Sequence, residues 1–524
     1  MNIRRKTLVV FSLLIVASMV LAACAPEPVE IFTTVEVPGE QVIQTVEVTV
    51  PVEVTQIVEV TPAAPVLSQE DIDQLWKQYE GQGLAINFLS EDTPPTAAIV
   101  NHLQEFEDLT GITVNLTTTN LADVGTKVLL DFSAGTGDIH VIYADPFIML
   151  APLYGHFLDL NDFVNDPTLP PVPNGIEDFD EMNMVGSGYM IDKEKLLAIP
   201  YDAPTILLTY RTDIFENETF KQMFMDEKGY DWTPGPNITW EQYAEIAEWI
   251  NGKVADGTLT EVSYGTGHQA RQYDSLMCDF SDVLLAYGAN YFANPDFATW
   301  GTSTPGGATL DTPEAIQAAE VYNSILAQAD PGSLGWDWNG VAEAFAAGNL
   351  AMSPQWHEYA SMFQDPTKSK VVDEVKWALL PSGPAGSKNL WGGTGLAING
   401  YASEDLQRAA WLFILWATSP DVQKALLLEG ATPTRTSVYE DPEVQQWIQE
   451  KKTPLMDTLV VLKEAWAPEH IGLSQGKIVT WIQVDETIFT NLSQMLTGGK
   501  TPEQAMQDAT EQINTINNWP PPTP

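Results

Sequence analysis

The sequence predicts an α/β protein with parallel sheet, and three observations support that class. Short apolar runs typical of buried strands alternate with segments whose apolar residues recur at helical spacing. The chain is 44% hydrophobic and contains 16 Trp, so it can build large cores. Its 524 residues exceed what one core usually organises, and we expect two or three domains.

The alternation is clearest near the start of the folded region. The expected elements there are a strand at 84–89, a helix through Ile99, Leu103 and Phe106 that Gly111 ends, a strand at 112–116, a helix at 124–132 and a strand at 139–143. Such an order indicates βαβ units, in which ligands bind beyond the carboxyl ends of the strands.

The rest of the chain continues the pattern with more helix. Residues 201–377 include expected helices at 240–250 and 313–327, and a strand at 395–398 precedes an amphipathic helix at 406–417. Further helices close the chain before the prolines at 520–522.

The N-terminus has the pattern of an export signal. Arg4, Arg5 and Lys6 precede an apolar run at 8–21, which is too short for a stable membrane span. The run ends in Leu-Ala-Ala-Cys24, which resembles a bacterial lipobox. We therefore expect residues 1–23 to be removed and Cys24 to carry lipid; the alternative is an ordinary secretory signal.

Residues 24–66 are predicted to be an extended tether. Val-Glu-Val-Thr recurs at 46–49, 52–55 and 58–61, and interspersed prolines interrupt any strand ladder. The alternative is a β-rich stalk. A lead-in segment at 67–83 and a tail at 519–524 complete the expected organisation.

Charge and cysteine content exclude several classes of function. The chain has 24 Lys and Arg against 71 Asp and Glu, a formal net charge of −47, which argues against nucleic-acid binding. Two cysteines and six scattered histidines provide no metal-binding pattern. We expect no metal and no cofactor.

Several segments together resemble the family-1 extracellular solute-binding proteins of ABC importers, which include maltose- and maltodextrin-binding proteins. They are HVIYADPFIMLAPLYGHFLDL at 140–160, IPYDAPTILLTYRTDIF at 199–215, Thr-Trp-Glu at 239–241, FAAGNLAM at 345–352 followed by Trp356, GGTGLAING at 392–400, AAWLFILWATSPDVQKALLLEGATPTR at 409–435 and GGKTPEQA at 498–505. Their order and spacing across 84–518 carry the resemblance.

The resemblance implies a type II fold of periplasmic binding proteins, with two α/β lobes, three hinge crossovers and a ligand between the lobes. The crossovers are expected near 200–203, 380–382 and 431–433. Lobe 1 would comprise 84–199 plus 382–430, and lobe 2 would comprise 204–379 plus 434–518. The implied function is capture of a carbohydrate outside the cell by a monomeric lipoprotein and its delivery to an ABC permease.

Carboxylates and aromatic side chains suit a sugar, which presents hydroxyl groups and apolar C–H faces. Glu91 and Asp92 follow the first strand, and Asp145 follows the third, where the family places a sugar-binding carboxylate. Asp145 could instead cap the following helix. The aromatic candidates for ligand contact are Trp336, Trp338, Trp356, Trp391, Tyr201 and Tyr273.

Three further residues lie at expected turns or crossovers. Gly392 and Gly393 could let the backbone approach a ligand or form a tight turn. Arg435 could bind a sugar hydroxyl group or form a structural ion pair.

The sequence contains no complete enzyme signature. Gly-Leu-Ser-Gln-Gly at 472–476 matches a nucleophile elbow, but the last histidine, His470, precedes the serine. We therefore expect no catalytic residue. Two alternatives remain open at this stage: the same fold binding a polyamine or other cationic solute, and a secreted polysaccharide hydrolase.

Overall fold

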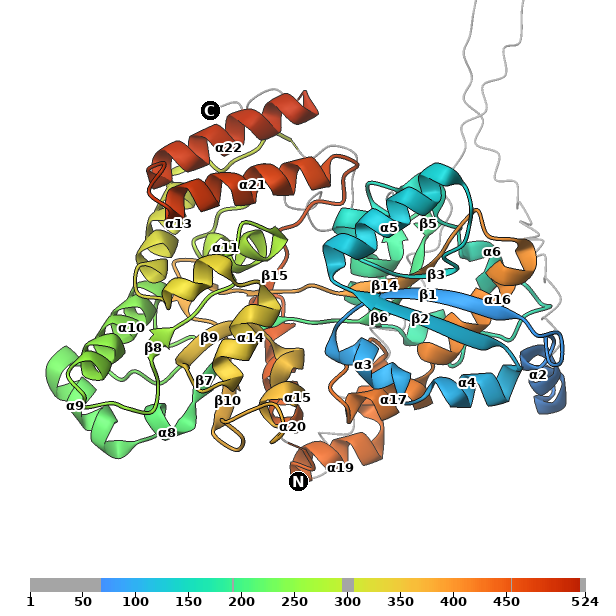
Figure 1. The fold of residues 1–524 in the computed structure, drawn as a ribbon, viewed down its shortest axis with the longest axis horizontal. Coiled ribbons are helices and arrows are strands. Elements are labelled where there is room, and N and C mark those ends of the chain that lie inside the picture. Colours follow the sequence, from blue (N-terminus) through green and yellow to red (C-terminus); the bar gives the residue numbers. More distant parts are fainter. Residues whose placement is uncertain (1–66, 191–192, 295–305, 454, 519–524) are drawn as a thin grey trace, which may run out of the picture. The chain divides into compact units, whose positions relative to one another are not determined.

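The computed structural model describes residues 67–190, 193–294, 306–453 and 455–518, which belong to one compact unit. The expected signal peptide, Cys24, the tether at 24–66 and the tail at 519–524 lie outside the described residues. Helix α2 (Gln69–Trp76) occupies the expected lead-in segment, and Ser68 caps it. The rest is organised around two sheets (Figure 1).

The first sheet has the strand order β2-β1-β3-β14-β6. Its strands are β2 (Thr113–Thr119), β1 (Ala85–Glu91), β3 (Val141–Ala144), β14 (Thr394–Ile398) and β6 (Ala198–Asp202). Strand β1 pairs in parallel with β2 and β3, whereas β14 is antiparallel to β3 and β6. The expected βαβ units are therefore present, and β14 is the one strand of this sheet that runs opposite to the other four.

Helices cover both faces of this sheet. On one face α5 (Leu121–Ala134) buries Val124, Val128 and Phe132 in a core shared with Leu89. On the other face lie α3 (Pro94–Val100), α4 (Leu103–Thr110), α16 (Glu404–Ala417) and α17 (Pro420–Leu427). The single helix expected through Ile99 and Phe106 is thus two helices. His102 lies between them and contacts Glu429, with 2.8 Å between Nε2 and Oε1.

The second sheet has the order β10-β7-β9-β8. Its strands are β10 (Val375–Ala378), β7 (Ile206–Arg211), β9 (Leu350–Trp356) and β8 (Tyr264–Thr266). Around it lie α8 (Thr212–Phe215), α9 (Glu218–Lys228), α10 (Trp240–Ala255), α11 (Asp274–Ala286), α13 (Pro313–Leu326), α14 (Trp338–Ala346), α15 (Ala360–Phe363), α20 (Leu455–Ala465), α21 (Trp481–Leu496) and α22 (Pro502–Asn517).

The chain passes between the sheets more than once. Residues 203–205 lead from β6 to β7, and residues 379–393 lead from β10 back to β14. These two segments touch, because the backbone N–H of Gly392 donates to the carbonyl oxygen of Pro204 at 2.8 Å.

A third segment follows α17. Helices α18 (Thr436–Glu440) and α19 (Pro442–Glu450) pack with α17, whereas α20 packs against β10 of the second sheet. We call the units built on the first and second sheets lobe 1 and lobe 2. The residue numbers at which each lobe begins and ends stay a prediction.

Candidate interlobe ligand site

Carboxyl groups from both lobes gather at the ends of strands and helices. We call Glu91, Asp145, Asp274, Asp337 and Asp485 the carboxyl cluster. Glu91 ends β1 and Asp145 follows β3, both in lobe 1. Asp274 begins α11, Asp337 caps α14 and Asp485 lies in the first turns of α21, all in lobe 2.

Glu91 shows how close these charges are. Its side chain is 6% exposed. Burial raises the pKa of Glu91 well above its usual value, and the negative charges of Asp145, Asp274, Asp92 and Asp337 raise it further. Groups from both lobes therefore act on one carboxyl group.

The Asp145 side chain caps a helical turn and also belongs to the carboxyl cluster. Its Oδ1 accepts hydrogen bonds from the backbone N–H groups of Phe147 at 2.7 Å and Ile148 at 2.8 Å. It thereby caps a π-helical turn (Pro146–Leu150). Burial nevertheless raises the pKa of Asp145 to about 6, against those bonds and the positive charge of Lys477. The cap and the cluster carboxylate are therefore the same side chain.

Asp274 and Asp485 form a buried carboxyl pair between α11 and α21. Burial, followed by the charge of Asp145, raises the pKa of Asp274 to about 7. The pKa of Asp485 is raised well above its usual value by burial and then by Asp274. Two carboxyl groups can hydrogen-bond only when one carries a proton, so the pair holds one near neutral pH.

Lys477 brings positive charge next to the cluster. Its ammonium group donates to the carbonyl oxygens of Val185 and Tyr189 in lobe 1, at 3.1 Å for Tyr189. Burial lowers the pKa of Lys477 to about 7, and the charge of Asp145 opposes this shift. The segment before α21 is thus attached to lobe 1 beside the site.

Aromatic side chains border the cluster on the lobe 2 side. The rings of Tyr273 and Trp338 are 5.4 Å apart, and the guanidinium carbon of Arg271 lies 5.5 Å from the Tyr273 ring centre. Arg271 also pairs with Asp337 at 3.1 Å. Burial raises the pKa of Tyr273, against a hydrogen bond with the backbone of Ala122 at the start of α5. Tyr273 therefore reaches lobe 1.

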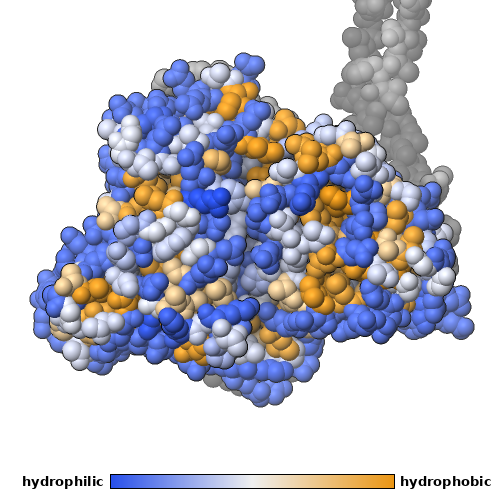
Figure 2. Space-filling model, in the orientation of Figure 1, coloured by the Kyte–Doolittle hydropathy of each residue, from blue (hydrophilic) through white to orange (hydrophobic). Residues whose placement is uncertain are grey.

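Figure 2 shows a hollow between the two halves of the visible face, with mostly hydrophilic colours around it. Carboxyl groups beside aromatic rings, as at Asp337 and Tyr273, can offer hydrogen-bond acceptors to hydroxyl groups and flat surfaces to C–H faces.

Trp391 and Trp356 are buried and pack beside Gly393 and Gly392. Trp391 is 1% exposed, and its Nε1 donates to Asn183 at 3.1 Å. A Cβ at Gly393 would lie 2.0 Å from the Trp391 ring, and one at Gly392 would lie 2.6 Å from the Trp356 ring. The two glycines therefore make room for tryptophan rings.

Trp336 and Tyr201 also make packing contacts. The Trp336 ring lies against the backbone at Gly332 and Gly340. Tyr201 is 2% exposed, and its hydroxyl group donates to the carbonyl oxygen of Pro95 at 3.2 Å.

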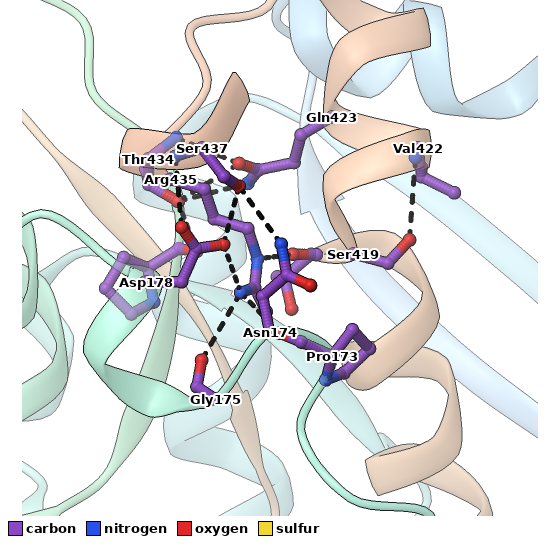
Figure 3. A network of polar contacts seen from close by, with 12 residues as sticks. Pro173, Asn174, Gly175, Asp178, Ser419, Val422, Gln423, Thr434, Arg435 and Ser437 are labelled. Atoms are coloured by element: carbon purple, nitrogen blue, oxygen red, sulfur yellow. Dashed lines mark hydrogen bonds and ion pairs between the residues drawn. The ribbon is translucent and has the colours of Figure 1, made fainter. Parts of the chain in front are cut away.

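Arg435 forms a structural ion pair, one of the two roles that the sequence allowed (Figure 3). It is fully buried, and Nη1 contacts Asp178 at 3.0 Å and the carbonyl oxygen of Pro173 at 2.7 Å. Its Nε donates to the carbonyl oxygen of Thr418. These partners join the loop at 173–178 to the end of α16.

Sequence reasoning missed Asp274, Asp337, Asp485 and Lys477. It included Asp92, whose side chain is exposed and whose negative charge acts on Glu91. One signal for Asp485 was present. It shares helical spacing with the apolar residues Trp481, Val484 and Ile488, so it falls on the buried face of its helix.

Within the described ranges, no group of three or more His, Cys, Asp or Glu side chains is arranged to hold a metal ion. Among the same residues, no helix has both the length and the apolar character needed to span a membrane.

Comparison with known proteins identifies the family. The model of the bacterial extracellular solute-binding protein family matches residues 102–452, about two thirds of the chain. The chain belongs to this family. The similar proteins named below are binding proteins of ABC transporters. The resemblance inferred from the sequence motifs is confirmed.

Relatives and solved structures agree with that assignment. A probable amino-acid ABC transporter periplasmic-binding protein of Sinorhizobium fredii is 22% identical, over 86% of this chain and 92% of its own. A solute-binding protein of Agrobacterium radiobacter K84, solved with ribitol, has a TM-score of 0.69 at 23% identity, covering 83% of this chain and 99% of its own.

A second solved structure is the maltose-bound MalE3 protein of T. maritima. It has a TM-score of 0.67 at 21% identity, with coverage of 83% of this chain and 100% of its own. These likenesses establish the fold, so the predicted two-lobe α/β class is confirmed. The chain is a solute-binding protein of an ABC transporter.

Proposed function

We propose that this solute-binding protein captures a neutral, hydroxyl-rich solute, a sugar or a polyol, outside the cell and delivers it to an ABC permease. It acts as a monomer anchored through lipid on Cys24. The observation that carries the proposal is the carboxyl cluster, in which acceptors from both lobes meet beside Tyr273 and Trp338.

The chemistry of the cluster fits hydroxyl groups. Carboxylate oxygens accept hydrogen bonds from sugar hydroxyls, and a carboxyl group that retains its proton also donates one. A solute that bonds to Glu91 of lobe 1 and to residues of lobe 2 would favour the closed arrangement. Structural relatives solved with ribitol, D-mannitol and maltose support this class of ligand. The comparisons do not favour a cationic solute or a hydrolase.

Calorimetry with a defined panel tests the proposal. Ribitol, mannitol, glucose, maltose and maltotriose would be titrated into the full chain, with spermidine as the cationic comparison. We expect at least one neutral member to bind. Absence of binding across the neutral panel, or binding of spermidine alone, would contradict the proposal.

Asp145→Asn tests the site itself. Asparagine caps a helix nearly as well as aspartate, so the fold is retained while the charged acceptor is lost. We expect about tenfold or greater weakening of binding for the best member of the panel, since hydrogen bonds to charged groups contribute about 1.5–3 kcal/mol. The matched control is Glu343→Gln, at an exposed position of α14. Equal affinities for the two variants would remove Asp145 from the site.

A further inference from the structure

The imidazole ring of His102 joins the break between α3 and α4 to the end of α17. His102 lies at that break, Glu105 lies in the first turn of α4, and Glu429 follows α17. Nδ1 of His102 is 2.9 Å from Oε1 of Glu105, and Nε2 is 2.8 Å from Oε1 of Glu429. Each ring nitrogen therefore faces a carboxyl group.

This arrangement requires a charged ring. An ionised carboxylate only accepts hydrogen bonds, so a ring nitrogen that bonds to one must carry a proton. A neutral imidazole carries a proton on one nitrogen, whereas the imidazolium ion carries one on each. Only the imidazolium ion can donate to Glu105 and Glu429 at the same time, and a neutral ring must give up one of the two bonds.

Asn101 holds the Glu429 carboxylate in place. Its Nδ2 donates to Oε2 of Glu429 at 2.7 Å, so each carboxylate oxygen has its own partner at the break between α3 and α4. We call Asn101, His102, Glu105 and Glu429 the histidine tie. The side chains of His102 and Glu429 are 16% and 33% exposed, so water screens their contact only in part.

The charges that act on His102 come from the tie itself. Partial burial lowers the pKa of His102, but the hydrogen bonds with Glu105 and Glu429 and the negative charges of these residues outweigh it. The pKa is therefore raised above its usual value. The structure thus favours the charged ring that the geometry of the tie requires.

The other titratable side chains of the helices that meet at the tie have partners elsewhere or lie at a distant end. Helix α3 has none. In α17, Asp421 lies in the first turn, at the opposite end from Glu429. The remaining pairs are Glu107 with the Val114 amide, Asp108 with Gln104, and Lys424 with Asp441.

The tie lies where lobe 1 meets lobe 2. Helix α3 packs against the turn His357–Tyr359 of lobe 2 as well as against α17. Gly430, next to Glu429, has a φ of +110°, and a Cβ there would lie 2.9 Å from the side chain of Ser361 in α15. The expected third crossover at 431–433 follows directly. A change in the tie therefore acts on the segment that leaves lobe 1.

We propose that the histidine tie is a pH-sensitive fastener between the α3–α4 break and the segment that enters the third crossover. The charged ring bonds to both carboxylates and holds the two segments together. When the ring loses a proton to water, one of these bonds is lost and the segment after α17 loosens. The proposal does not depend on which solute the protein binds, nor on the carboxyl cluster.

The tie stabilises lobe 1 on the acidic side of its titration. The pKa of His102 is higher in the folded chain than in the unfolded chain, where a histidine titrates near 6.5. The stabilisation is therefore fully present below about pH 6.5, and it is lost as the pH rises through the higher folded value. The segment after α17 should loosen on the alkaline side.

Nuclear magnetic resonance of the full chain, labelled with carbon-13 at histidine Cε1, measures the charge of the ring. His102→Gln identifies the His102 signal by removing it. We expect His102 to titrate above pH 6.5 and above His140, whose pKa is lowered by burial. A His102 midpoint at or below 6.5 would overturn the proposal.

Glu429→Gln keeps the size of the side chain and removes its charge. We expect the His102 midpoint to move down toward 6.5, because the ring loses one of its two carboxylate partners. Glu343→Gln, at an exposed position of α14, is the matched control and should leave the midpoint unchanged. An unchanged midpoint in Glu429→Gln would contradict the tie. If that variant does not fold, Glu105→Gln applies the same test at the other ring nitrogen.

Hydrogen exchange measures whether the charge of the ring reaches the crossover. The Glu429 and Ala431 amides, which donate to the carbonyl oxygen of Leu426, would be followed in the full chain at pH 6 and pH 8.5 and corrected for intrinsic rates. We expect their protection factors to fall about two- to fivefold, the effect of losing a partly exposed ion pair. Amides paired between β1 and β2 should stay constant.

His102→Gln removes the titrating ring, so the difference between the two pH values should disappear at Glu429 and Ala431. Equal protection at both pH values in the unaltered chain would overturn the proposal. The same loss of protection in His102→Gln would also overturn it, because the loss would then come from another group.

Discussion

Arg435 illustrates what a buried cation does in a chain that has few of them. Its contacts with Asp178 and with carbonyl oxygens hold the loop at 173–178 against the segment after α17. Removing one partner of such a pair leaves the other charge buried and unpaired, which costs more than the pair itself contributes. The side chain is therefore critical for stability although it is remote from the carboxyl cluster.

Arg435→Met should lower the free energy of unfolding by about 3–5 kcal/mol, because Asp178 loses its counter-ion. Urea denaturation monitored by tryptophan fluorescence measures the change. The matched control is Lys376→Met, whose pair with Glu216 is about half exposed and should contribute less than about 1 kcal/mol. Similar losses in both variants would contradict the distinction between the buried and exposed pairs.

Site residues could be predicted from the sequence where the sheet topology determines their location. Glu91 and Asp145 follow strands whose carboxyl ends share one edge of a sheet, and the structure places both in the cluster. The alternation of side chains along a strand decides whether Glu91 or Asp92 is buried, and that choice depends on a strand end which sequence fixes only to within a few residues. Asp274 and Asp485 meet through helix packing, which one sequence does not reveal.

The loop at 391–393 has little room for added side-chain volume. Two tryptophan rings occupy the space where side chains at 392 and 393 would lie. The glycines at this place were identified from sequence as sites of ligand approach or of a tight turn, and the packing of two tryptophan rings is a further reason for glycine here. Only the packed structure shows which ring fills the space.

Gly393→Ala should lower the free energy of unfolding by about 1–3 kcal/mol, because its Cβ would lie 2.0 Å from the Trp391 ring and force the ring to move. Thermal unfolding followed by near-ultraviolet circular dichroism reports both the stability and the environment of the tryptophans. Gly155→Ala is the control, since no atom lies within 4 Å of a Cβ there. An unchanged melting temperature for Gly393→Ala would contradict the packing argument.

Elements with strong periodicity were predicted well. The expected helix at 313–327 corresponds to α13, and the amphipathic helix at 406–417 corresponds to α16, whose Trp411 and Trp416 lie in the core. The break between α3 and α4 was not predicted, because apolar spacing continues across it. The contact of His102 depends on Glu429, which lies just after α17 and more than 300 residues away in sequence.

At the scale of the whole chain, the two-lobe fold could be predicted because the sequence motifs follow one another in the same order as in the family, across most of the chain. The lobe limits were harder to place. Helices α18 and α19 pack with α17, whereas α20 packs against β10 of the second sheet. Packing against a distant partner, rather than local propensity, decides to which lobe such helices belong.

In the proposed function, lipid on Cys24 attaches the protein to the membrane. Cys24→Ser should remove the acyl mass from the mature chain and release the protein into the soluble fraction. Mass spectrometry of the N-terminal peptide and fractionation of cells would measure both effects. Cys278→Ser, at a buried position, is the control and should remain membrane-bound. Retention of the Cys24→Ser chain at the membrane would contradict the lipid anchor.

The position of β14 has a consequence for how the protein acquires its fold. This strand lies between β3 and β6, yet it comes almost 200 residues after β6 in the chain. A chain that emerges N-terminus first therefore exposes an unpaired edge of β3 until residue 398 has appeared. During that interval the first lobe is an incomplete sheet and a potential client for a chaperone. The second sheet, whose strands all lie between 206 and 378, can form earlier.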